Sequence, residues 1–174
     1  MRYCDRTLQL LLRTFFDIIR LRKGPEHLPD SSLILVLSFG LLLFATFCST
    51  VLIKPSVGDS IVLSFLTSLL GYVFYSFVLT ATGFARRFVQ TISAIMACGS
   101  LLTVLMVFAY VMLAPFLGTS IASIVATLIL FWSVPVKGHI IARAIERHWY
   151  LGIVISMSIF VMQFGIYSAL TGQD

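Results

Sequence analysis

The sequence predicts an all-α protein: a polytopic bundle of about five transmembrane helices, preceded by an amphipathic helix in the membrane interface. Three observations support this prediction. The chain is 59% hydrophobic and 11% charged, with a mean hydropathy of +1.04, whereas a soluble domain is about 45–50% apolar and about 25% charged. Five apolar segments approach the length of about 20 residues that a helix needs to cross a bilayer. The charged residues lie between these segments and not inside them.

The N-terminal element is expected to be an amphipathic helix over residues 7–23. Polar residues recur there in steps of three and four, which places them on one face of a helix: Arg6, Gln9, Arg13, Asp17 and Arg20. The other positions are mostly Leu, Ile and Phe. A basic amphipathic helix of this kind lies in the plane of the membrane interface. Arg13 and Asp17 are spaced for an ion pair.

The five expected spans follow at residues 32–53, 60–82, 88–113, 116–136 and 150–170. No Asp, Glu, Lys, Arg or His lies inside any of these ranges, and a charge at the centre of a span costs roughly 2.5–3.5 kcal/mol on the insertion scale. Asp30 or Ser31 is placed to cap the first span. That span is also longer than the apolar core of a signal peptide, so it is expected to stay in the membrane.

The third and fourth spans are separated by only Ala114 and Pro115. Their combined length of about 50 residues is too great for a single crossing. We therefore expect a tight helical hairpin that turns at Pro115, because proline cannot continue the helical hydrogen-bond ladder.

Basic residues are distributed asymmetrically between the loops. Six precede the first span, Arg86 and Arg87 follow the second, and Lys137, Arg143 and Arg147 follow the fourth, whereas only Lys54 lies on the other side. Because cytoplasmic loops carry the excess of Lys and Arg, a cytoplasmic N-terminus and a C-terminus on the opposite face are predicted. This placement also accounts for the net charge of +5. Nucleic-acid binding is not expected, since there is no long basic run.

Small residues recur at four-residue intervals on three predicted spans. They are Ser60, Ser64 and Ser68 with Gly71, then Gly118, Ala122 and Ala126, and then Gly152 and Ser156. Small faces let helices approach closely in lipid, where association depends on van der Waals packing. We interpret them as packing faces within the chain; the alternative is a face for a protein partner or a homo-oligomer.

Basic residues in the two expected cytoplasmic loops form the candidate binding site. Arg86 and Arg87 lie in one loop. In the other, His139, Arg143 and Arg147 stand at positions i, i+4 and i+8, which form one face if the segment is helical. A basic surface beside a membrane attracts anionic lipid head groups or an acidic partner. The alternative is a solvated loop that only fixes the topology.

No catalytic, cofactor-binding or metal-binding residues are indicated, and enzymatic activity is not expected. Cys4, Cys48 and Cys98 match no metal or redox spacing, and His139 and His148 would point to opposite faces of a continuous helix. Ion-coupled transporters place an ionisable residue inside the bundle, and none lies inside the predicted spans.

Two segments resemble a known family. Residues 83–91, GFARRFVQT, combine a glycine, a short basic stretch and a Phe-x-Gln-Thr entry into the third span, and residues 131–144 lead to a basic turn before the fifth. Over roughly residues 30–170 the pattern resembles bacterial Yip1-domain proteins. The resemblance implies five spans, a cytoplasmic N-terminus and a bacterial inner-membrane location, and it supplies no catalytic residues. The trafficking and GTPase-linked roles of eukaryotic members are not expected, because their long cytosolic N-terminal region has no counterpart here.

The predicted function is that of a non-enzymatic inner-membrane scaffold, or of a component that interacts with membrane lipids or a protein partner. The alternative is a transport component for a neutral or lipidic substrate. That alternative depends on the hydroxyl residues of spans two to four: Ser64, Thr67, Ser68, Thr103, Ser120, Ser123 and Thr127.

Overall fold

The fold is a bundle of helices, as predicted. The computed structural model describes residues 13–28, 31–53 and 58–171, and these residues contain no strand. After a helical segment at residues 13–19, the elements are η1 (Pro25–His27), α2 (Ser32–Ile53), α3 (Gly58–Ala81), η2 (Ala85–Arg87), α4 (Phe88–Ala144) and α5 (Trp149–Thr171). The all-α prediction is therefore confirmed.

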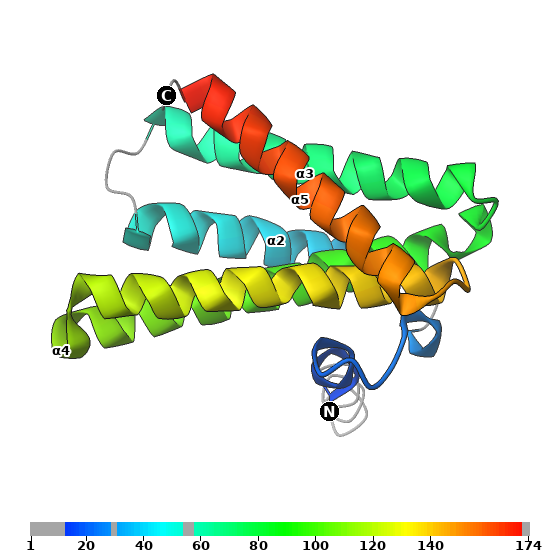
Figure 1. The fold of residues 1–174 in the computed structure, drawn as a ribbon, viewed down its shortest axis with the longest axis horizontal. Helices are drawn as coiled ribbons and strands as arrows, with labels where there is room; N and C mark the ends of the chain where they lie inside the picture. The colour runs from blue at the N-terminus through cyan, green and yellow to red at the C-terminus, as the bar shows by residue number, and fades with distance from the viewer. Residues whose placement is uncertain (1–12, 29–30, 54–57, 172–174) are drawn as a thin grey trace.

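The long helices lie alongside one another, with α4 at the centre. Figure 1 shows α2, α3 and α4 running along the longest axis, while α5 crosses them obliquely. Helix α4 contacts α2, α3 and α5. The bounds of α2, α3 and α5 agree with the predicted apolar ranges to within two residues. Ser31 caps α2, since its Oγ accepts a hydrogen bond from the Leu33 N–H at 3.3 Å; Asp30 lies outside the described residues.

Helix α4 folds back on itself at Gly118. This residue has φ 81° and ψ 159°, a conformation that essentially only glycine adopts. The first arm, residues 88–117, and the second arm, residues 119–144, lie side by side (Figure 1). The predicted turn at Pro115 is wrong, because Pro115 lies within the helix of the first arm. Proline removes one helical hydrogen bond and bends the axis, whereas this reversal uses the positive φ of glycine.

The second arm of α4 is also longer than predicted. It passes through Pro135 and ends at Ala144, well beyond residue 136. Lys137, His139 and Arg143 are therefore helical and do not lie in a loop. A hydropathy boundary marks where the apolar residues end, but a helix makes its own backbone hydrogen bonds and can continue past that boundary.

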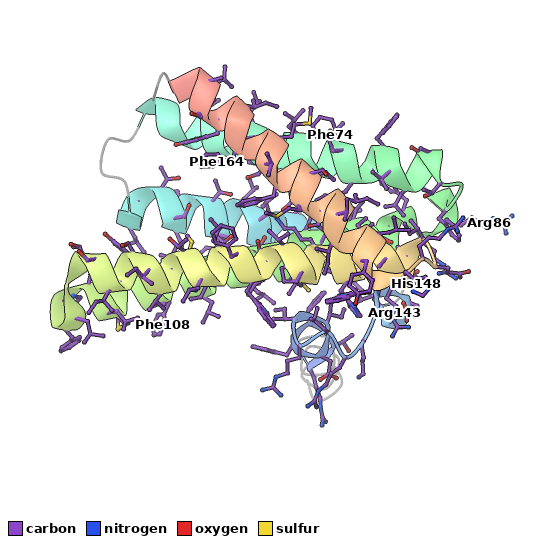
Figure 2. All side chains as sticks on the ribbon, viewed as in Figure 1. Phe74, Arg86, Phe108, Arg143, His148 and Phe164 are labelled. Atoms are coloured by element: carbon purple, nitrogen blue, oxygen red, sulfur yellow. The ribbon has the colours of Figure 1, made fainter. Side chains whose placement is uncertain are left out.

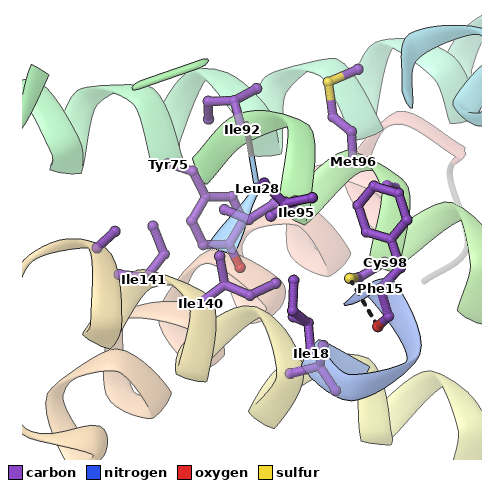
Figure 3. Packing of buried hydrophobic residues seen from close by; sticks show 14 of the residues in the cluster. Phe15, Ile18, Leu28, Tyr75, Ile92, Ile95, Met96, Cys98, Ile140 and Ile141 are labelled. Atoms are coloured by element: carbon purple, nitrogen blue, oxygen red, sulfur yellow. Dashed lines mark hydrogen bonds between the residues drawn. The ribbon is translucent and has the colours of Figure 1, made fainter. Parts of the chain in front are cut away.

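The N-terminal segment forms a short helix across one side of the bundle. Residues 13–19 are helical, and Figure 1 shows this helix end-on, so its axis crosses those of the long helices. Phe15 and Ile18 are buried in the core, and Cys98 Sγ lies 3.9 Å from the Phe15 carbonyl oxygen (Figure 3). The helix ends before residue 20 and not at residue 23 as predicted, and residues 7–12 lie outside the described residues.

An ion pair closes the turn after this helix. Asp17 Oδ2 lies 2.8 Å from Lys23 Nζ, so Lys23, and not the predicted Arg13, is the partner of Asp17. The hydrogen bond from the Lys23 ammonium lowers the pKa of the Asp17 carboxyl from its ordinary value of 3.8.

The surface of the bundle is largely apolar. Exposed side chains include Phe108, Phe116, Val154 and Phe164, with Phe108 61% exposed (Figure 2). Several polar residues are buried instead, namely Ser38, Thr50, Thr91, Ser93, Ser100, Ser133, His139 and Ser156. Soluble monomers rarely expose contiguous apolar surface of this extent. In a bilayer the same apolar surface contacts lipid in place of water.

Three of the described helices are long and apolar enough to cross a bilayer. They are Ser32–Leu52, Phe88–Ala144 and Trp149–Leu170, and α3 adds a shorter apolar helix, Phe65–Ala81. Together with the exposed apolar side chains, these helices define an integral membrane protein whose apolar helix faces contact lipid.

Small residues bring α4 and α5 into close contact. A Cβ on Gly138 would lie 2.9 Å from the Gly152 carbonyl oxygen, and a Cβ on Gly152 would overlap the Gly138 carbonyl. Ala122, Ala126 and Ser156 are buried as well. Ala122, Ala126, Gly152 and Ser156 are thus used for packing within the chain. Gly118 of the same pattern is exposed at the turn of α4, and the side chains of Ser60 and Ser64 lie outside the described ones.

Candidate functional site

An open cleft of about 810 Å³ lies where the N-terminal segment meets the end of α4. Four structural regions line it: the N-terminal segment, the η2 turn, the last turns of α4, and the loop into α5. The lining residues are Leu21, Glu26, Arg87, His139, Ala142, Arg143, Glu146, Arg147, His148 and Trp149. Its size lies within the range of about 300–1,000 Å³ that is typical of ligand sites.

Two residues of the cleft adopt a left-handed backbone conformation. Leu21 has φ 60° and Glu146 has φ 53°, and within the described chain they are the only non-glycine residues with positive φ. Each ends a helix in the same hydrogen-bond pattern: Arg22 N–H donates to the Asp17 carbonyl, and Arg147 N–H to the Ala142 carbonyl. This is the Schellman motif, which normally places glycine at that position.

Helix α3 shows the ordinary form of the motif. Gly83 has φ 82°, and the Phe84 N–H donates to the Leu79 carbonyl. A left-handed non-glycine residue costs roughly 1–2 kcal/mol, and backbone strain of this kind clusters at functional sites. The strained non-glycine caps at Leu21 and Glu146 both lie in the cleft, whereas the glycine cap does not line it.

An ion pair joins two loops at the edge of the cleft. Arg87 Nη2 lies 2.7 Å from Glu146 Oε1, and the Arg87 guanidinium carbon is 6.0 Å from the centre of the Phe84 ring. The left-handed backbone at Glu146 directs its carboxylate to Arg87. The pair therefore fixes the α4–α5 loop relative to η2 and neutralises one arginine of the cleft.

Two other arginines of the cleft remain uncompensated. Arg143 and Arg147 are exposed, and neither guanidinium forms an ion pair with any residue that the structure describes. His148 is exposed beside them. Figure 2 shows Arg143 and His148 together where α4 ends and α5 begins. Guanidinium groups present a fork of N–H donors that matches phosphate oxygens.

His139 lies on the inner wall of the same cleft. Its side chain is only 8% exposed, and Nε2 has no hydrogen-bond partner among the described residues. A buried imidazole nitrogen without a partner loses the hydrogen bonds that water would supply. The nitrogen is itself buried in the wall of the cleft, behind the exposed arginines.

Two aromatic residues lie next to the cleft. Trp149 and Tyr150 follow His148 directly, their ring centres are 5.0 Å apart, and Tyr150 is 72% exposed. Trp and Tyr concentrate at the boundary between the hydrocarbon and the head groups. A Trp-Tyr pair beside the cleft is typical of that boundary.

Four of the five residues selected from the sequence meet in this cleft. Arg87, His139, Arg143 and Arg147 line it, whereas Arg86 does not and projects away from the bundle in Figure 2. Sequence reasoning missed Leu21, Glu26, Glu146, His148 and Trp149 as lining residues. The basic character of the loop was the only sequence feature that indicated His148. No sequence feature indicated that the N-terminal segment approaches the cleft.

The arrangement offers recognition of an anion. His139 and His148 line the same cleft because the helix ends between them, so the opposite-face geometry of a continuous helix does not apply. Across the ranges that the structure describes, no cluster of three or more His, Cys, Asp or Glu could hold a metal ion. The uncompensated groups are cationic or hydrogen-bonding, so an anionic oxygen is the complementary ligand.

The fold and the cleft define a class of protein: an integral membrane helix bundle with a basic cleft at one end. Comparisons with protein-family models, with curated proteins and with solved structures found no match.

Proposed function

We propose that this chain is a non-enzymatic, multi-pass protein of the bacterial inner membrane that binds an anionic phospholipid head group in the basic cleft. Through that contact it acts as a membrane scaffold. The resemblance to Yip1-domain proteins belongs to the same proposal, as does the topology of five spans with a cytoplasmic N-terminus.

The arrangement of the helices supports this topology. Helix α3 and the second arm of α4 run toward the end that carries Arg86 and Arg143, and α2, the first arm and α5 run away from it (Figures 1 and 2). Counting each arm of α4 as one crossing gives five. Because this end carries the basic loops, the positive-inside rule assigns it to the cytoplasm.

The observation that carries the head-group assignment is the pair of uncompensated arginines beside the Trp149–Tyr150 interface marker. Juxtamembrane Lys and Arg attract anionic lipids with about 1 kcal/mol per residue. The cleft adds a defined shape, because the Arg87–Glu146 ion pair and the packed N-terminal segment hold its walls.

Lipid binding by purified protein tests the proposal. We compare wild type with the double variant R143Q/R147Q in nanodiscs of phosphatidylcholine with added phosphatidylglycerol, and count retained lipid by native mass spectrometry. Loss of two guanidinium contacts is expected to weaken phosphatidylglycerol retention about tenfold or more. R86Q is the matched control, because Arg86 is basic and exposed but lies outside the cleft.

Equal retention by wild type and R143Q/R147Q would contradict the proposal. Equal losses in R86Q and R143Q/R147Q would also contradict it, because the effect would then be one of net charge and not of the cleft. Retention of an acidic protein in place of lipid, lost in the double variant, would reassign the cleft to a protein partner.

A transport component for a neutral or lipidic substrate is the second candidate. Ser68 and Thr103 line an internal cavity of about 140 Å³, whereas Ser120, Ser123 and Thr127 are exposed on the outside of α4. A cavity of this volume has room only for a small molecule. A liposome assay tests the candidate; the absence of both solute flux and lipid scrambling would eliminate it.

A further inference from the structure

A partly open cavity between the helices is lined by a lysine that the sequence had placed in a loop. About 140 Å³ in volume, it is bordered by α2, α3, both arms of α4 and α5. Its polar lining consists of Thr46, Ser49, Ser68, Tyr72, Tyr75, Thr103, Ser133, Lys137 and Gln163. Lys137 is therefore an ionisable residue inside the bundle, contrary to the expectation that the bundle interior has none.

Lys137 is partly buried between the helices of the bundle. It precedes the end of α4 at Ala144 by seven residues, which corresponds to about 10 Å along the helix axis. Its Cε is 3.5 Å from the point that a Cβ on Gly99 would occupy, and Tyr72 Oη is 3.9 Å from that point. The lysine and the tyrosine thus both approach Gly99, where the missing side chain leaves room.

Most of the other polar groups of the cavity are already satisfied. The hydroxyls of Thr46, Ser49, Thr103 and Ser133 donate to carbonyl oxygens of their own helices, at 2.6 to 3.2 Å. Tyr75 shares a hydrogen bond of 2.9 Å with Ser156, and Gln163 Nε2 donates to the Thr67 carbonyl at 2.8 Å.

The Lys137 ammonium and the Tyr72 hydroxyl make no hydrogen bond or ion pair with any residue in the described part of the chain. No Asp or Glu lines the cavity. An ammonium group that faces a cavity between apolar helices is stabilised by a partner that neutralises or solvates it. Ionisable residues inside membrane bundles commonly mark ligand or ion sites.

From this geometry we infer that the cavity is a binding site for a small monovalent anion, with Lys137 as counter-ion and Tyr72 as second donor. Chloride, formate and acetate are suitable in charge and size. The cavity has room for on the order of five water-sized particles, at about 30 Å³ each. This site is separate from the basic cleft, and it does not require the cleft to bind lipid.

The unfolding midpoint in detergent, followed by circular dichroism, tests the inference. Sodium chloride, formate or acetate replaces sodium gluconate at constant ionic strength, so that general screening is held fixed. Wild type is expected to show a saturable rise in the midpoint with the small anions. K137M is expected to lose this response, and R143Q/R147Q is expected to keep it because those residues line the other site.

Y72F provides a second variant if K137M does not fold. Y72F removes one hydrogen bond to a charged ligand and is therefore expected to raise the half-saturating anion concentration about tenfold. A midpoint independent of the anion in wild type would overturn the inference, as would an unchanged response in K137M, or in Y72F where K137M cannot be measured. A response lost in R143Q/R147Q and kept in K137M would assign the anion to the cleft. Comparison of chloride with the two carboxylates identifies the preferred chemistry.

Discussion

At the scale of single residues, the backbone at the cleft is held in a conformation that local preference opposes. Leu21 and Glu146 have positive φ at the position where Gly83 ends α3 in the same motif. The Glu146 carboxylate gains an ion pair with Arg87, but exposed pairs contribute only about 0–1 kcal/mol. That gain does not exceed the conformational cost, so stability alone does not explain a glutamate here.

Replacing Glu146 with glycine is therefore expected to stabilise the fold. Relief of the left-handed strain outweighs the exposed ion pair, for a net gain of up to about 1 kcal/mol. The matched change, Gly83→Ala, is expected to destabilise by about 1 kcal/mol, because it introduces the strain that Glu146 carries. Unfolding in mixed micelles measures both, and a loss of stability in E146G equal to that in G83A would contradict the explanation.

The Asp17–Lys23 pair gives a pH-dependent prediction. Because the pKa of Asp17 is lowered in the folded chain, its contribution is present above the ordinary value of 3.8 and is lost as the pH falls through the folded value. Lys23→Met is expected to return the pKa toward 3.8, as read from the carboxyl carbon shift by NMR. Arg20→Gln serves as control, and a pKa unchanged in K23M would show that Lys23 is not the cause.

At the scale of elements, hydropathy was sufficient to locate the helices but not to define α4. Apolar length gave the bounds of α2, α3 and α5 closely. It misplaced the reversal of α4, because Pro115 is the more familiar helix breaker while the conformation is one that Gly118 alone supplies. Hydropathy also predicted that this helix ends at residue 136, just before the first charged residue. Lys137 was therefore predicted to lie outside the bundle interior.

The cleft could be predicted only in part, because helix packing and long-range contacts bring its residues together. The spacing of His139, Arg143 and Arg147 placed them near one another, but their different burial depends on how α4 packs. Leu21 and Glu26 are far away in sequence and reach the cleft because Phe15 and Ile18 fix the N-terminal segment to the core. No local pattern in a single sequence encodes that approach.

The crossing of α4 and α5 depends on glycine. Gly152→Ala is expected to destabilise by about 1–3 kcal/mol, since the new Cβ would overlap the Gly138 carbonyl and separate the helices. Gly165→Ala on the same helix is the control, because no atom lies within 4 Å of a Cβ there. Comparable losses in both variants would mean that the close approach is not what requires glycine.

At the scale of the whole molecule, one end of the bundle differs from the other. The basic cleft and the Trp149–Tyr150 pair lie at one end, and the Gly118 turn lies at the other (Figures 1 and 2). Between them the described surface is largely apolar. We propose that this difference between the two ends sets the orientation of the protein in the inner membrane.

A topology map tests this central claim most directly. Paired alkaline phosphatase and green fluorescent protein fusions after residues 55, 87, 118, 147 and 174 report the side of the membrane on which each position lies. We expect fluorescence at 87 and 147 and phosphatase activity at 55, 118 and 174. Phosphatase activity at 87 or 147, or fluorescence at 118, would contradict it, because the cleft would then not face the cytoplasm or α4 would not cross the membrane twice.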